Sequence, residues 1–155
     1  MLIVYVDTDT QMHERIAESF YQQPHNVVSF SELFEAYKWI KRNEIPDVIV
    51  TEMDVESSTG LQALKFLLTK AKLKQTRIVG YANAGVDRYA DLAVAEGASL
   101  LLPKAELPEQ LASYVKRLSA PATKAKTLRD VEKARGKTAP ASPAASETLA
   151  TRRAR

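Results

Sequence analysis

The sequence predicts an α/β fold in which a five-stranded parallel sheet is covered by helices on both faces. Five short apolar runs alternate along the chain with five segments whose apolar residues recur every three or four positions. The connections between these segments are short, which suits parallel strands joined by helical crossovers. The runs are nearly continuous in apolar residues, as expected for strands that are buried on both faces. By analogy with other doubly wound sheets, the expected strand order is 2-1-3-4-5.

The first half of the chain contains three predicted strands, at residues 2–6, 26–30 and 46–51. Asp9 can cap the first helix, which is expected to end near Pro24. The second helix begins either with a capping box formed by Ser29 and Glu32 or at Ser31. The inward faces of the two helices are predicted to be Met12, Ile16 and Phe20 in the first, and Leu33, Tyr37 and Ile40 in the second.

The second half contains two predicted strands, at residues 77–82 and 99–102, and three helices. The third helix starts near Gly60, and the fourth spans residues 86–96 and is stopped by Gly97, a residue that readily adopts a left-handed backbone. Pro108 suits the first position of the last helix. The inward faces are predicted to be Leu61, Leu64, Leu68 and Ala71 in the third helix, and Leu111, Val115 and Leu118 in the last.

Composition excludes several classes of function. The 155 residues contain no cysteine and two histidines, so disulfides, thiolate chemistry and an ordinary zinc site are excluded. No apolar run is long enough to span a membrane. The first strand begins directly after Met1 and leaves no room for a signal peptide, so we expect a cytoplasmic protein. There is no glycine-rich phosphate loop, which argues against flavin, dinucleotide or nucleotide enzymes.

Charge divides the chain into a domain, 1–119, and a tail, 120–155. Residues 1–120 carry 13 Lys and Arg against 16 Asp and Glu, whereas residues 121–155 carry nine against three. The tail is rich in Ala, Pro, Lys and Arg, and its few large aliphatic residues are Leu128, Val131 and Leu149. Such a segment cannot bury enough apolar surface to order itself, so we predict that it is disordered. Any nucleic-acid binding is expected to be weak and to come from this tail.

Charged side chains follow three of the predicted strands. Asp7 and Asp9 come after the first strand, Glu52 after the third and Lys104 after the fifth. Because the carboxyl ends of parallel strands meet at one edge of a sheet, these groups are expected to lie together.

These residues and their spacing resemble the receiver domain of response regulators, a flavodoxin-like (CheY-like) fold, over about residues 1–119. The matching features are the acidic Val6-Asp7-Thr8-Asp9, the strand ending in Glu52, Gly60 eight residues later, Tyr81-Ala82, Gly97-Ala98 and Lys104. The resemblance implies that Glu52 occupies the position of the phosphorylated aspartate. It also implies that Thr8 replaces a direct Mg²⁺ ligand, and that Tyr81 replaces the switch Ser or Thr. We therefore interpret the chain as a degenerate receiver, or pseudo-receiver.

The same resemblance implies an acidic pocket of Asp7, Asp9 and Asp54, with Tyr81 and Lys104 at the switch positions. It implies no cofactor other than weakly held Mg²⁺, for which Asp7 and Glu52 are the candidate ligands. Glu52 and Lys104 are expected to form a standing charge pair that partly imitates the phosphorylated state. Tyr81 is expected to pack at the sheet edge with its hydroxyl in water, and His13 and His25 to be plain surface residues.

Three functions remain open. The first is a non-enzymatic interaction module in two-component signalling that works without phosphorylation. The second is a phosphorelay receiver that still accepts a phosphoryl group on Glu52 or a nearby acid, and the third is a polyanion tether acting through the tail. The expected partners are a histidine kinase, a phosphotransfer protein or another signalling protein, with a homodimer as an alternative and no membrane contact.

Overall fold

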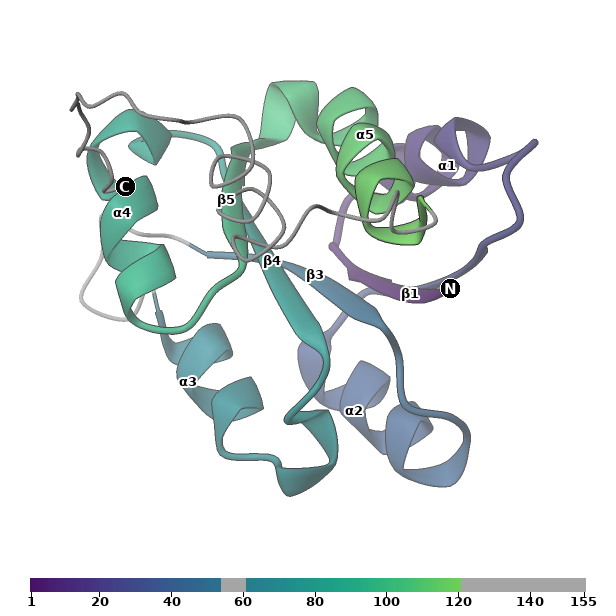
Figure 1. The fold of residues 1–155 in the computed structure, drawn as a ribbon, viewed down its shortest axis with the longest axis horizontal. Coiled ribbons are helices and arrows are strands. Elements are labelled where there is room, and N and C mark those ends of the chain that lie inside the picture. Colours follow the sequence, from purple (N-terminus) through teal and green to yellow (C-terminus); the bar gives the residue numbers. More distant parts are fainter. Residues whose placement is uncertain (54–60, 121–155) are drawn as a thin grey trace, which may run out of the picture. The chain divides into compact units, whose positions relative to one another are not determined.

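Five parallel strands form one sheet in the order β2-β1-β3-β4-β5, as predicted (Figure 1). The computed structural model describes residues 1–53 and 61–120. The strands are β1 (Leu2–Val6), β2 (Asn26–Phe30), β3 (Val48–Glu52), β4 (Arg77–Ala82) and β5 (Leu100–Pro103). The three central strands, β1, β3 and β4, are adjacent and parallel, and almost all of their residues are buried. This confirms the expectation drawn from their continuous apolar runs.

Helices cover both faces of the sheet (Figure 1). They are α1 (Thr10–Ser19), α2 (Leu33–Arg42), α3 (Gln62–Leu68), α4 (Val86–Ala95) and α5 (Leu107–Ser119), with short 3-10 turns η1 (Ala71–Leu73) and η2 (Lys104–Glu106). One apolar core lies between the sheet and α1 and α5, and the other lies between the sheet and α2, α3 and α4. Successive residues of a strand therefore face different cores, because side chains alternate across a sheet.

The helix starts differ in how well the sequence predicted them. The Asp9 side chain accepts hydrogen bonds from the backbone N–H groups of Gln11 and Met12, so the predicted cap of α1 is confirmed. The capping box predicted for α2 is wrong. Ser29 lies inside β2, and the cap residue Glu32 makes no side-chain hydrogen bond to the helix. α1 also ends at Ser19, several residues before the predicted end.

The third helix is shorter than predicted and buries a different pair of leucines. α3 ends at Leu68, so Ala71 belongs to the separate turn η1. Leu64 and Leu67 are fully buried, whereas Leu68 is 49% exposed. Gly97 has the expected left-handed backbone, with φ of 120°. A Cβ atom at this position would come within 2.8 Å of the Leu68 side chain, so the site also has little room for a larger residue.

Several predictions concern residues outside the described ranges. Asp54 and Gly60 lie in the segment 54–60, and the predicted tail lies almost entirely in 121–155. These remain predictions. Among the residues that the structure describes, no helix is long and apolar enough to cross a membrane.

Candidate functional site

The carboxyl ends of four strands bring the sequence-predicted residues to one edge of the sheet. Asp7 directly follows β1, Glu52 ends β3, Tyr81 is the penultimate residue of β4, and Lys104 directly follows β5. The strand register places Glu52 beside Tyr81. The parallel order thus assembles groups that are up to 97 positions apart in the sequence.

Asp7 is the centre of the site. The residue is 5% exposed, and its carboxylate accepts a hydrogen bond of 2.6 Å from the Tyr5 hydroxyl and one of 3.0 Å from the backbone N–H of Asp9. The Lys104 ammonium lies 3.3 Å from its Oδ2 atom and 3.5 Å from its Oδ1 atom. Both carboxylate oxygens therefore have donors, and the buried charge has a cation beside it, as a buried carboxylate requires.

This environment changes the proton affinity of Asp7 and Tyr5. Burial raises the pKa of Asp7, but the hydrogen bonds from Tyr5 and from the Asp9 backbone, together with Lys104, outweigh it and hold the pKa below its usual range. Burial and the bond to the Asp7 carboxylate raise the pKa of Tyr5 far above its usual value. Tyr5 is thus held as a neutral donor and Asp7 as an anionic acceptor.

The predicted charge pair between Glu52 and Lys104 is wrong. Within residues 1–53 and 61–120, the ion pairs of Lys104 are with Asp7 and, at 3.8 Å, with Asp9. Glu52 is exposed, and its Oε1 atom lies 3.5 Å from the Asn83 side-chain nitrogen. The lysine lies beside the carboxylate that is out of water, where the lower dielectric makes the attraction stronger than at the exposed Glu52.

Tyr81 also differs from expectation. Its side chain is fully buried, and its hydroxyl donates a hydrogen bond of 2.8 Å to the Val6 carbonyl oxygen. Its ring stacks on Tyr5 with centroids 6.0 Å apart, and the Lys104 ammonium lies 5.9 Å from its ring centroid. Burial is the main reason that the pKa of Tyr81 is raised well above its usual value. The sequence offered one signal, since a tyrosine inside a buried strand needs an internal partner for its hydroxyl.

His13 is part of the same site, although we predicted a plain surface residue. Its Nε2 atom lies 2.6 Å from the Asp7 carbonyl oxygen, and its ring meets Tyr5 edge-on at 5.6 Å. Its position, one turn after the Asp9 cap, could have suggested this contact. His25 likewise packs edge-on against Phe20, so it is not a plain surface residue either.

The described residues offer few free oxygen ligands to a Mg²⁺ ion. Magnesium needs several oxygen ligands in near-octahedral geometry, and the expected ligands were Asp7 and Glu52. The oxygens of Asp7 already accept hydrogen bonds, Lys104 places a positive charge beside them, and Glu52 faces solvent. Groups of three or more side chains that could hold a metal are absent from these ranges. Asp54 lies outside them.

The comparison with protein families decides the identity of the fold. The model for "Response regulator receiver domain" matches residues 3–116. This chain belongs to the response regulator receiver domain family. It is therefore related to the receiver domains of two-component signalling. No curated protein sequence matches the chain.

Solved receiver structures share the fold at low sequence identity. The BeF3-activated N-terminal receiver domain of Klebsiella pneumoniae RstA is 22% identical, with a TM-score of 0.61 over 76% of this chain and 97% of that one. The chemotaxis response regulator CheY4 of Vibrio cholerae is 20% identical, with a TM-score of 0.62 over 75% and 96%. A response regulator protein from Burkholderia multivorans is 20% identical, with a TM-score of 0.61 over 79% and 97%.

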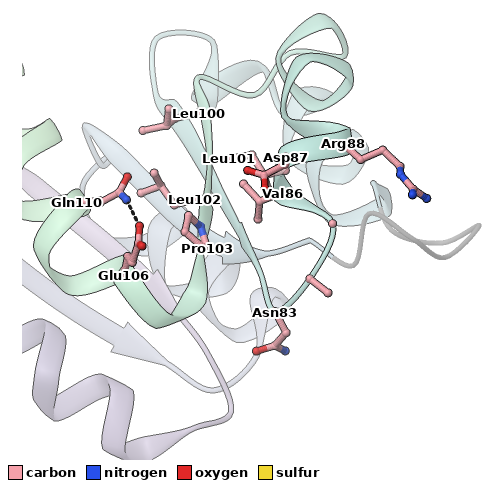
Figure 2. Close-up of a pocket in the computed structure, with 12 residues that line it drawn as sticks. Asn83, Val86, Asp87, Arg88, Leu100, Leu101, Leu102, Pro103, Glu106 and Gln110 are labelled. Carbon is pink, nitrogen blue, oxygen red and sulfur yellow. Dashed lines mark hydrogen bonds between the residues drawn. The ribbon is translucent and has the colours of Figure 1, made fainter.

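A groove lies beside the site of this receiver domain, between α4, β5 and the start of α5 (Figure 2). Leucines of β5 line it, and Glu106 and Gln110, which are hydrogen-bonded to each other, lie along one side. The groove connects with the site through two residues. Asn83 lines the groove and also reaches Glu52, and Pro103 lines it directly before Lys104. The groove thus adjoins the sheet edge that carries the site.

Proposed function

We propose that this receiver domain transmits signals by contact with a protein partner and without being phosphorylated. The observation that carries the proposal is the closed network around Asp7, in which Tyr5, the Asp9 backbone and Lys104 already satisfy the carboxylate. A site whose charges are neutralised internally needs neither a metal ion nor a phosphoryl group to hold its arrangement. The domain is then a non-enzymatic interaction module.

The position of each group supports this proposal chemically. Transfer of a phosphoryl group to a carboxylate requires cations that neutralise the charge developing on the phosphoryl oxygens. The cation of this site, Lys104, is bound to Asp7, and Glu52 lies outside ion-pair distance of it. Tyr81 replaces the small hydroxyl residue of the family pattern, and its hydroxyl is held by the Val6 carbonyl. A buried ring cannot make the short inward movement of a Ser or Thr.

Membership of the family supports a signalling protein as the partner. Receiver domains work with other signalling proteins, so the expected partner is a histidine kinase, a phosphotransfer protein or another signalling protein. A second copy of the chain is an alternative partner. Because the site stays in one arrangement, binding is expected to be insensitive to phosphodonors.

One observation favours a second candidate function. The Glu52 carboxylate is exposed and has a single long contact, with Asn83, among the described residues. A small phosphodonor could therefore reach it. In this alternative the chain is a phosphorelay receiver that accepts a phosphoryl group on Glu52.

The deciding experiment is intact-mass measurement after incubation of the full chain with acetyl phosphate and Mg²⁺. We expect no phosphoryl adduct, and an adduct that disappears in Glu52→Gln would instead establish the second function. A receiver with the usual aspartate, treated in parallel, shows that the donor is active. A variant that combines Thr8→Asp, Glu52→Asp and Tyr81→Thr restores the family pattern, and its phosphorylation would show that these three positions block the reaction.

A further inference from the structure

Basic residues are concentrated in one segment of the folded domain, although residues 1–120 are acidic as a whole. Residues 61–77 contain five Lys and Arg and no Asp or Glu. They include α3, the turn η1, the first residue of β4 and the residues that connect these elements. The last turn of α2 carries two more basic residues, Lys41 and Arg42. α2 and α3 lie on the same side of the sheet (Figure 1). The acid pocket is at the carboxyl edge of the sheet, whereas α2 and α3 end at the opposite edge.

Aromatic rings join the two helices into one continuous surface. Tyr37 of α2 meets Phe66 of α3 edge-on, with centroids 5.6 Å apart. The Lys70 ammonium lies 4.3 Å from the Phe66 centroid and 5.3 Å from that of Tyr37, and Lys41 lies 5.7 Å from Tyr37. Cation–π contacts of this kind hold the ammonium groups at defined places. We call this the basic-aromatic surface: its contacts join Phe34, Tyr37, Lys38, Lys41, Phe66 and Lys70. The exposed Lys65, Lys72 and Lys74 are neighbours of Phe66 and Lys70 in the sequence, and we include them in the name.

Among the residues that the structure describes, most cations of this surface have no acidic partner. The single ion pair found here among the described residues joins Lys38 to Glu35 on α2, at 2.7 Å. Lys65, Lys72 and Lys74 are exposed. Phe34 is 59% exposed, with the Lys38 ammonium 5.3 Å from its ring centroid. The surface therefore offers several positive charges and one accessible ring to a ligand.

We propose that the basic-aromatic surface binds single-stranded nucleic acid. Lysines that follow the phosphate backbone, combined with an exposed ring on which a base can stack, are the elements that such binding uses. An acidic protein partner fits less well, because the centres of protein interfaces are depleted in lysine and built around apolar anchors. DNA and RNA share the chemistry required here. The inference goes beyond the proposed function and does not depend on it.

The test measures fluorescence anisotropy of labelled oligo-dT and oligo-U against the full chain over a range of salt concentrations. The test variant is Lys70→Gln, Lys72→Gln and Lys74→Gln combined. The matched control changes three tail lysines, Lys124, Lys126 and Lys133, to Gln and so removes the same charge. We expect the test variant to lose about tenfold in affinity at low salt and the logarithmic salt slope to fall by about 2, since each phosphate contact contributes roughly 0.7.

Further measurements distinguish base stacking from charge attraction, and a nucleic-acid ligand from an acidic protein. Phe34→Ala is expected to weaken binding several-fold with an unchanged salt slope, and a duplex, whose bases cannot reach the ring, is expected to bind more weakly than the single strand.

Wild-type affinity in the triple test variant would overturn the proposal, as would an equal or larger loss in the tail control. Equal binding of duplex and single strand would also overturn it. Displacement by polyglutamate at equal charge concentration would assign the surface to an acidic protein instead. A preference for oligo-dT or for oligo-U shows whether the bound single strand is DNA or RNA.

Discussion

The Tyr81 hydroxyl in β4 donates a hydrogen bond of 2.8 Å to the Val6 carbonyl in β1, although β3 lies between these two strands. A side chain at a position that the family uses for a small switch residue thus links two central strands from inside the core. The same ring stacks on Tyr5 and has the Lys104 ammonium 5.9 Å from its centroid. Tyr81 is therefore a structural part of the site.

Removing this hydroxyl is expected to destabilise the fold. Tyr81→Phe removes one hydrogen bond from the buried Val6 carbonyl, which costs about 0.5 to 1.5 kcal/mol in the free energy of unfolding. Tyr81→Thr also empties the space of the ring, and the cost rises to about 3 to 5 kcal/mol. Urea unfolding measures both. Equal stability of wild type and Tyr81→Phe would contradict the bond to Val6.

The partner of Lys104 can be tested with two double-mutant cycles. The cycle of Asp7→Asn with Lys104→Met is expected to give a coupling of about 1 kcal/mol or more, because the buried carboxylate and the ammonium are 3.3 Å apart. The matched cycle of Glu52→Gln with Lys104→Met is expected to give a coupling close to zero. Urea unfolding of the single and double variants supplies both values. A larger coupling in the second cycle would restore the charge pair that the sequence suggested.

Tyr5 and Tyr81 are expected to resist ionisation in the folded chain. The pKa of each is raised by burial above the value of about 10 that an unfolded tyrosine has. Their contribution to stability is thus complete below about pH 10 and is lost as the pH rises beyond it. Ultraviolet titration of the phenolate band, compared between wild type and the variant with Tyr5→Phe and Tyr81→Phe, isolates these two groups. Ionisation of either group in the folded chain near pH 10 would contradict their burial.

Asp7 is expected to make the domain sensitive to acid. Its folded pKa is lowered, so the stability that it contributes is present above the unfolded pKa of about 4 and is lost as the pH falls through the folded pKa. Asp7→Asn removes this dependence and is expected to flatten the fall in stability below about pH 4. The urea midpoint as a function of pH measures the effect. If the urea midpoint of Asp7→Asn falls with decreasing pH as steeply as that of wild type, other carboxylates are responsible for the acid sensitivity.

The sheet was predictable because its signals are local and repeated. Each buried strand is a short apolar run, and the Asp9 cap and the left-handed Gly97 depend on their immediate neighbours. The errors arose where two local signals competed. The spacing of Ser29 and Glu32 suits a cap, but pairing with β1 draws Ser29 into β2, because backbone hydrogen bonds in the sheet outweigh one side-chain bond.

The sequence by itself determined which charged residues lie at one edge of the sheet, and the tertiary structure alone decided how they pair. Strand order brings Asp7, Glu52, Tyr81 and Lys104 to one edge, and the sequence was sufficient to predict this. Whether Lys104 pairs with Asp7 or Glu52 depends on which carboxylate is buried, and that depends on the Tyr81 ring and the Tyr5 hydroxyl beside it. The grouping of lysines around Tyr37 likewise arises from packing between α2 and α3. Burial and side-chain reach depend on contacts between distant segments, so they are absent from any local pattern in the sequence.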